Sequence, residues 1–231
     1  GIGKTTLAQK IYNHQKVQAH FAKTLWVCVR QNYSEIKLLK EIIRVAGGGQ
    51  DIHPEATKAE LLPRLSSALE GNRFLLVLDD VWRADVWQDL LRTPLGHGVA
   101  SGSRVLVTTR NVNVARSMGA IQTDEVQKLS ADDGWALLCK IVFEDGAEDD
   151  IQDLHEIGMS IVDKCHGLPL AIKAVGGVLR TKDRRKNEWE KLHGSQTWSV
   201  KGDLPEEVRG ALYLSYEDLP SQLKQCFLYC A

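Results

Sequence analysis

The stretch from Phe74 to Asp80 reads Phe-Leu-Leu-Val-Leu-Asp-Asp, and it decides the fold class of this chain. A short continuous apolar run of this kind is typical of a strand that is buried on both faces of a sheet. The strand ends in two carboxylates, Asp79 and Asp80, which are costly to bury unless they bind something. Taken alone, the pair can equally be a turn or a helix cap, because aspartate favours both.

Two further strands are predicted around this one, from Thr24 to Val29 and from Arg104 to Thr108. Segments with helical periodicity lie between and beside them, over about residues 7–21, 34–46, 57–70 and 112–118. Strands that alternate with helices along a chain favour a parallel sheet covered by helices. The first half of the chain is therefore predicted to be an α/β fold.

The chain opens with Gly-Ile-Gly-Lys-Thr-Thr over Gly1 to Thr6, ahead of a predicted helix. Gly3, Lys4 and Thr5 match the end of the phosphate-binding pattern GxxxxGK[ST], in which backbone N–H groups surround phosphate oxygens at a helix N-terminus. In that pattern Lys4 reaches the terminal phosphates and Thr5 ligates Mg²⁺. Taken alone, the stretch can also be an ordinary helix start. The acidic pair at residues 79–80 favours the phosphate interpretation, because phosphate loops act together with acids at a strand end.

The first glycine of this pattern, and the strand before it, would precede residue 1. We therefore expect a P-loop NTPase parallel sheet with its first strand missing. That strand is central in such sheets, so we expect its two neighbours to lack backbone partners, at roughly 1–3 kcal/mol for each buried unpaired group. Unpaired strand edges predict a chain that aggregates easily.

A third polar site follows the strand that begins at Arg104. Arg110 stands just after this strand, and the carboxyl end of a parallel strand faces the ligand crevice of an α/β sheet. Its planar donor fork suits a terminal phosphate. The alternative is a surface arginine at the start of a loop, since most arginines are exposed.

The second half of the chain has helical periodicity almost throughout, with apolar faces over about residues 130–141, 151–165 and 168–179. Another helix is predicted to open at residues 203–205, after a linker from Gly194 to Gly202. We predict three regions: an α/β region over residues 1–125, a helical region over residues 126–199, and the beginning of a third over residues 200–231.

The composition excludes several classes of function. With 29 Lys+Arg against 30 Asp+Glu, the net charge of −1 gives no general attraction to nucleic acid or to anionic membranes. The five scattered cysteines form no CxxC pair, so neither a disulfide framework nor a zinc site is indicated. No apolar run approaches the ~20 residues of a spanning helix. We interpret His166 beside Cys165 as structural, and the basic run from Lys182 to Lys186 as a solvated loop.

Six blocks of the sequence occur in the same order as in the plant NB-ARC domain, the nucleotide-binding switch of intracellular leucine-rich-repeat immune receptors. They are Gly1 to Thr6, Phe21 to Val29, Leu76 to Trp82, Ser103 to Arg110, Gly167 to Ala171 and Cys226 to Ala231. The chain resembles this family over its whole length. Trp82 after the acidic pair, together with the aromatic and cysteine blocks, resembles the coiled-coil (non-TIR) subclass.

The resemblance implies a role for each matching position. Residues 126–199 would be the helical ARC1 subdomain, and residues 200–231 the start of the winged-helix ARC2 subdomain. Asp80 would be the catalytic acid, and Thr5 and Asp79 would hold Mg²⁺. Arg110 would distinguish ATP from ADP, and Pro169 would pack near the adenine and ribose. The phosphate loop would comprise Gly1, Ile2, Gly3, Lys4, Thr5 and Thr6.

The family further implies an ADP/ATP-binding switch in plant defence, off with ADP and on with ATP, that hydrolyses ATP slowly in the cytoplasm. Its partners would be the leucine-rich-repeat and N-terminal signalling domains of the same protein, and it would oligomerise on activation. Nucleic acid is not expected as a partner, nor is a transmembrane segment. Two alternatives stay open: a housekeeping ATPase or kinase with fast turnover, and an interaction scaffold with a degenerate nucleotide site. The intact Lys4, Asp79 and Asp80 argue against the scaffold.

Overall fold

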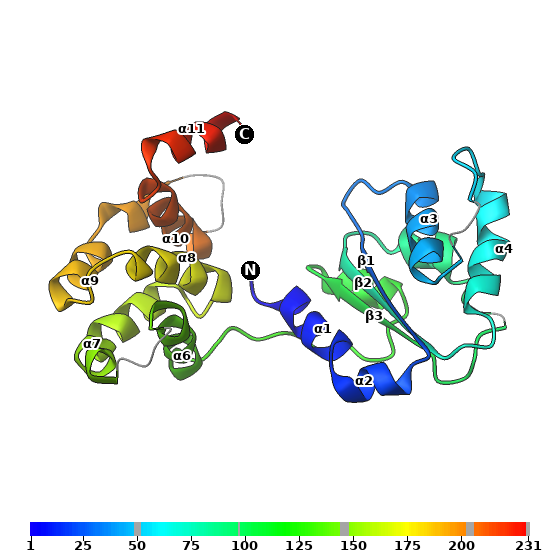
Figure 1. Cartoon of the computed structure of the whole chain (residues 1–231), viewed down its shortest axis with the longest axis horizontal. Coiled ribbons are helices and arrows are strands. Elements are labelled where there is room, and N and C mark those ends of the chain that lie inside the picture. Colours follow the sequence, from blue (N-terminus) through cyan, green and yellow to red (C-terminus); the bar gives the residue numbers. More distant parts are fainter. Residues whose placement is uncertain (49–51, 97, 144–147, 202–205, 230–231) are drawn as a thin grey trace. The chain divides into compact units, whose positions relative to one another are not determined.

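The computed structural model describes residues 1–48, 52–96, 98–143, 148–201 and 206–229 (Figure 1). The chain forms two compact units, one of residues Lys4–Glu125 and the other of Gly1–Gly3 with Val126–Ala231. The change from one unit to the other falls between Glu125 and Val126. Each unit has its own hydrophobic core, so each is described by itself.

The Lys4–Glu125 unit is built on a three-stranded parallel sheet, which confirms the predicted α/β class. Its strands are β1 (Lys23–Cys28), β2 (Phe74–Val81) and β3 (Arg104–Thr109). The order is β1-β2-β3, so β2 is the central strand. The decisive stretch of the sequence therefore lies at the centre of the sheet, with its two aspartates at the carboxyl end.

The expectation that strands beside a missing first strand would lack partners is wrong for the sheet that the structure describes. β2 pairs with β1 on one side, Leu25 facing Leu76, and with β3 on the other, Leu76 facing Val105. Strands β1 and β3 carry apolar residues at these positions, so each can lie directly beside β2 and pair with its backbone. Direct pairing avoids the cost of about 1–3 kcal/mol for each buried backbone group left unpaired.

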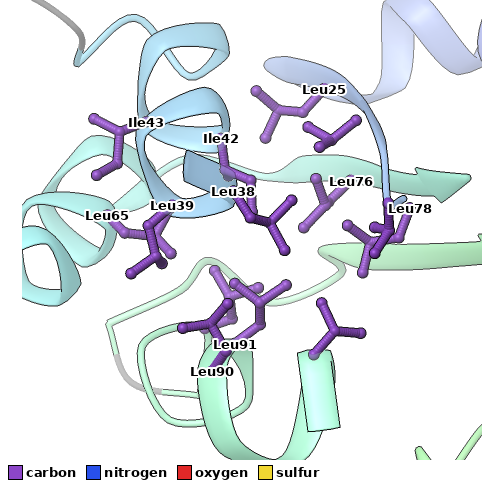
Figure 2. Packing of buried hydrophobic residues seen from close by; sticks show 14 of the residues in the cluster. Leu25, Leu38, Leu39, Ile42, Ile43, Leu65, Leu76, Leu78, Leu90 and Leu91 are labelled. Atoms are coloured by element: carbon purple, nitrogen blue, oxygen red, sulfur yellow. The ribbon is translucent and has the colours of Figure 1, made fainter. Parts of the chain in front are cut away.

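Side chains of β2 alternate between two faces of the sheet, as the period of a strand requires. Leu76 and Leu78 enter the larger core, which is shown in Figure 2. Three helices contribute most of the other residues of this core: α3 (Glu35–Val45), α4 (Lys58–Leu69) and the π-helix η1 (Val86–Leu91). Strand β1 adds Leu25 and Val27. A capping box begins α4, in the segment expected to be helical over about residues 57–70: the Thr57 N–H donates to Glu60 Oε2 at 2.8 Å.

Leu75 and Val77 point to the other face, where a smaller core contains Ala8, Tyr12 and Phe21. Two helices, α1 (Lys4–Tyr12) and α2 (Gln15–His20), replace the single helix predicted over residues 7–21. The break falls at His14, whose backbone is extended and whose ring nitrogen accepts a hydrogen bond from the Lys16 N–H. The side chain of His14 thus caps a new helix, which periodicity alone did not reveal.

The second unit is helical, as its periodicity predicted. Its central helix is α8 (Pro169–Arg180), which packs against α6 (Ala131–Val142) and α10 (Glu206–Glu217). Trp189, on a helix that the sequence did not predict, is fully buried in this core. The predicted helix opening at residues 203–205 lies outside the described residues. The remaining elements of the chain are α5 (Val112–Ser117), α7 (Glu148–Lys164), α9 (Lys186–His193), η2 (Gln196–Ser199) and α11 (Ser221–Tyr229).

Candidate functional site

A cluster of hydroxyl groups surrounds Asp79 at the carboxyl end of β2. The Thr5 hydroxyl, in the first turn of α1, donates to both Asp79 carboxylate oxygens at 3.0 and 3.2 Å. The Thr108 hydroxyl, on β3, donates to Asp79 Oδ1 at 2.5 Å, and the Cys28 thiol, on β1, lies 3.9 Å from Oδ2. Three elements far apart in the sequence thus converge on one carboxylate. Thr5 and Asp79, which were predicted to hold Mg²⁺, are brought together.

Asp79 is only 5% exposed, yet no cationic side chain in the described part of the chain forms an ion pair with it. A buried carboxylate without a compensating charge is costly. Hydroxyl and thiol donors satisfy its lone pairs but leave its charge uncompensated. The donor set of one carboxylate and one hydroxyl oxygen therefore suits a hard divalent cation such as Mg²⁺.

An irregularity in β2 separates the two aspartates. The pairing of Leu78 with Val107 is followed by that of Val81 with Thr109, so Asp79 and Asp80 together face the single residue Thr108. Asp80 adopts the left-handed conformation, with φ of 57°, and its N–H donates to the Thr108 hydroxyl at 2.9 Å. Such bulges re-aim side chains beside functional sites. Here the bulge allows Asp79 to stay buried while Asp80 is turned toward the surface.

Asp80 forms a second cluster with an arginine and a tryptophan. Arg110 Nε lies 3.4 Å from Asp80 Oδ1, and the Trp82 indole N–H donates to Asp80 Oδ2 at 3.1 Å. The Arg110 guanidinium also lies over the Trp82 ring, 5.1 Å from its centroid. Asp80 and Arg110, which were predicted as separate site residues, are therefore in direct contact. Both are accessible, with side chains 43% and 68% exposed, so a ligand can reach them.

The predicted phosphate-loop residues divide between the two units. Lys4, Thr5 and Thr6 form the first turn of α1, with Lys4 half-buried and both threonines exposed. In the described part of the chain, the Lys4 ammonium takes part in no hydrogen bond or ion pair. A helix N-terminus with an uncommitted ammonium group in its first turn is a suitable anion site.

Gly1, Ile2 and Gly3 belong to the helical unit, where Ile2 packs against the core. The Leu170 N–H, in the first turn of α8, donates to the Gly1 carbonyl oxygen at 3.3 Å. A Cβ added at Gly1 would lie 2.7 Å from Leu170 Cβ, so only glycine fits there. Pro169 is the first residue of α8, where its missing N–H is no loss. The start of the loop therefore lies against the helix that Pro169 begins.

Outside these two clusters, the described residues offer little sign of a further site. Burial raises the pKa of the Cys165 thiol to about 12, so it stays protonated beside His166 and is no nucleophile. Among the described residues, no group of three or more metal-binding side chains gathers, and no helix is both long and apolar enough to cross a bilayer. A polar surface pocket contains none of the predicted site residues; it is lined by Gln31, Asn32, Tyr33, Glu35, Arg83 and Asp85.

Comparison with protein families decides the relationship of the chain. The NB-ARC domain matches residues 1–148, which is more than half of the sequence. This chain belongs to the NB-ARC family. The match includes the predicted phosphate-loop residues, both aspartates and Arg110, so the family assignment covers the same region as the site geometry.

The NB-ARC chain is also similar to plant proteins over nearly its full length. It is 42% identical to disease resistance protein RGA2 of Solanum bulbocastanum, covering 100% of this chain and 23% of that protein. It is 37% identical to disease resistance RPP13-like protein 4 of Arabidopsis thaliana, covering 99% and 27%, and 34% identical to disease resistance protein RPM1 of the same plant, covering 100% and 26%. The chain thus spans about a quarter of the length of these relatives.

The sequence did not single out Thr108 or the contacts of Trp82. Thr108 is the one buried residue of β3, and its hydroxyl forms hydrogen bonds with both Asp79 and Asp80. A polar residue near the end of an apolar strand could have indicated a functional position. Which groups its hydroxyl contacts, however, depends on the register between β2 and β3. Trp82 was noted only as a mark of the subclass, because nothing in the sequence indicates that Arg110 lies over its ring.

Proposed function

We propose that this chain is the nucleotide-binding switch of a plant disease resistance protein, which holds ADP in its off state and ATP in its on state. The observation that carries the proposal is the contact between the Thr5 hydroxyl and the buried Asp79 carboxylate, at 3.0 Å. A threonine that follows the loop lysine, set against an acid at a strand end, is the arrangement with which P-loop proteins bind magnesium and nucleotide. Membership of the NB-ARC family supports the same conclusion.

Each residue of the site contributes a distinct interaction. The α1 N-terminus and Lys4 would bind the terminal phosphates, because backbone N–H groups and an ammonium without a partner favour negative charge there. Gly1, Ile2 and Gly3 would approach the phosphates with their backbone, and Thr6 would add a hydroxyl in the first helical turn. Pro169 would pack near the base and sugar.

Mg²⁺ would be held by the Thr5 hydroxyl and by Asp79, directly or through water. Thr5 and Asp79 alone would not complete a cage among the described residues, which is usual for Mg²⁺, since nucleotide phosphates and water complete its coordination. The bound ion would neutralise charge on the phosphates. Asp80 would accept a hydrogen bond from the attacking water and orient it, and Arg110 would respond to the presence of the γ-phosphate.

A switch transmits a signal only if its two states bind the nucleotides with different affinity. Arg110 can supply such a difference, because only ATP offers a γ-phosphate. The similarity to disease resistance proteins supports a role in defence. Within this proposal the switch acts in the cytoplasm, its partners are the leucine-rich-repeat and N-terminal signalling domains of the same protein, and it oligomerises on activation.

The test is ADP and ATP binding by the purified protein, expressed from its complete reading frame. Lys4→Ala should weaken ADP binding about tenfold or more, since it removes a charged phosphate contact. Lys10→Ala removes an exposed lysine from the same helix α1 and should leave the affinity unchanged. Equal ADP affinity in the Lys4→Ala variant and the wild type would refute the proposal.

Steady-state turnover separates the switch from a housekeeping ATPase or kinase. A switch that is reset by hydrolysis should turn over well below the ~1 per second that is typical of metabolic enzymes. Turnover at or above that rate would favour the housekeeping alternative, which no observation on this chain supports.

A further inference from the structure

The contacts of Trp82 extend the proposed function to a residue that is neither in the phosphate loop nor a ligand of the cation. The indole touches both members of the Asp80–Arg110 pair: its N–H donates to Asp80 Oδ2 at 3.1 Å, and its ring lies 5.1 Å from the Arg110 guanidinium carbon. The side chain is half-buried at the end of β2, so its own position is held by the fold. Asp80, Trp82 and Arg110 form a closed triangle of contacts.

The triangle uses only part of the guanidinium. Arginine has five N–H donors, and the ion pair with Asp80 joins Nε to Oδ1 at 3.4 Å. In the described part of the chain, the two Nη groups of Arg110 donate no hydrogen bond. One edge of the guanidinium therefore faces the carboxylate, one face lies on the indole, and the Nη edge stays available to an anion.

An exposed ion pair does not by itself hold an arginine in one place. The Asp80–Arg110 pair has side chains 43% and 68% exposed, and such pairs contribute little because both side chains are flexible and solvated. Asp80 itself is fixed, since its left-handed backbone donates to Thr108 and its second oxygen accepts from Trp82. The indole adds a flat surface on which the guanidinium can lie. Trp82 is thus the contact that orients Arg110.

We propose that Trp82 is a positioning residue for Arg110: it holds the guanidinium with its Nη edge free for the γ-phosphate, and so sets the preference for ATP over ADP. This inference rests on the proposed function, because it requires that the chain bind both nucleotides. Beyond that function, the inference names Trp82 as a residue that makes the affinities for ATP and ADP differ. Trp82 acts through Arg110 and touches no nucleotide itself.

The experiment measures ATP and ADP affinities of the purified protein and compares their ratio among variants. Trp82→Leu should lower the affinity for ATP relative to ADP about 2- to 5-fold, the change expected for one exposed cation–π contact. Trp82→Phe keeps an aromatic face but loses the indole N–H, so its ratio should lie between those of Trp82→Leu and wild type. Trp87→Leu removes an indole of the same unit that contacts neither Asp80 nor Arg110 and should leave the ratio unchanged.

A double-mutant cycle separates positioning from a structural role. In an Arg110→Ala background, Trp82→Leu should no longer change the ATP/ADP ratio, because the residue through which it acts is gone. A ratio unchanged by Trp82→Leu in the wild type, or a change that persists without Arg110, would overturn the inference. If Trp82→Leu does not fold, the same double-mutant cycle is measured with Trp82→Phe in its place. Failure of the wild type to bind either nucleotide would instead refute the proposed function.

Discussion

Thr108→Val is the perturbation that tests the organisation of the site most directly. Valine has nearly the shape of threonine but no hydroxyl, and Thr108 is only 8% exposed. Its hydroxyl donates to Asp79 at 2.5 Å and accepts from the Asp80 N–H at 2.9 Å. The substitution therefore removes two hydrogen bonds and leaves the volume of the side chain almost unchanged.

The expected loss in free energy of unfolding follows from the two groups to which the Thr108 hydroxyl is bonded. A hydrogen bond to a charged group contributes about 1.5–3 kcal/mol, and a backbone N–H bond about 0.5–1.5 kcal/mol. Since Asp79 is buried and gains no water in exchange, we expect Thr108→Val to lower the local free energy of unfolding by about 2–4 kcal/mol. Thr108→Ser keeps the hydroxyl and loses one methyl group, so it should cost about 1 kcal/mol.

The assay is amide hydrogen exchange, followed by mass spectrometry on the peptide that covers β2. Because the chain has two units, a local probe reports on the α/β unit where a global melt would mix both. Thr108→Val should exchange faster at β2 than Thr108→Ser. The reasoning is refuted if both variants protect β2 as well as the wild type, or if valine protects it better than serine.

Three other outcomes are expected. Gly167→Ala should lower the free energy of unfolding of the helical unit by about 2 kcal/mol or more, because Gly167 has φ of 67° and an added Cβ would lie 2.5 Å from the Leu129 carbonyl oxygen; an unchanged thermal melt would contradict this. Iodoacetamide at about pH 8 should alkylate the exposed Cys28 and spare Cys165, whose pKa burial raises to about 12. Equal labelling of the two thiols, read by mass spectrometry, would show that this expectation is wrong. The pKa of Glu60 is lowered, chiefly by the hydrogen bond that its carboxylate accepts from the Thr57 backbone N–H. The stabilisation of α4 by Glu60 is therefore present above the unfolded pKa of about 4.3, and it is lost as the pH falls through the lower pKa of the folded state. Exchange of α4 amides should then differ between wild type and Glu60→Gln at pH 7 and converge near pH 3, and a difference that does not depend on pH would refute it.

Much of this protein could be predicted from local patterns in its sequence. The apolar run that ends in Asp79 and Asp80 indicated a buried parallel strand, because only a strand covered on both faces is apolar at every position. The helices expected from about residues 57 and 130 do begin there, with Thr57 and Ser130 as their N-caps, because such a cap depends on residues only three apart in the chain. Gly3, Lys4 and Thr5 are likewise adjacent in the chain, so their match to a phosphate-binding pattern could be seen in the sequence, although only the acidic pair at residues 79–80 favoured it over an ordinary helix start.

Other features depend on contacts between distant segments, and only the tertiary structure decided them. The sequence predicted unpaired strands, but the apolar faces of β2 and β3 allowed them to pair directly. Whether Thr108 reaches both aspartates depends on a register in which two residues of β2 face one of β3. The contact of Trp82 with Arg110 joins residues 28 positions apart through that same register. The sequence by itself determined which chemical groups this protein carries and the strands that bear them. Their distances and partners were decided by the tertiary structure, because packing between strands sets which side chains meet.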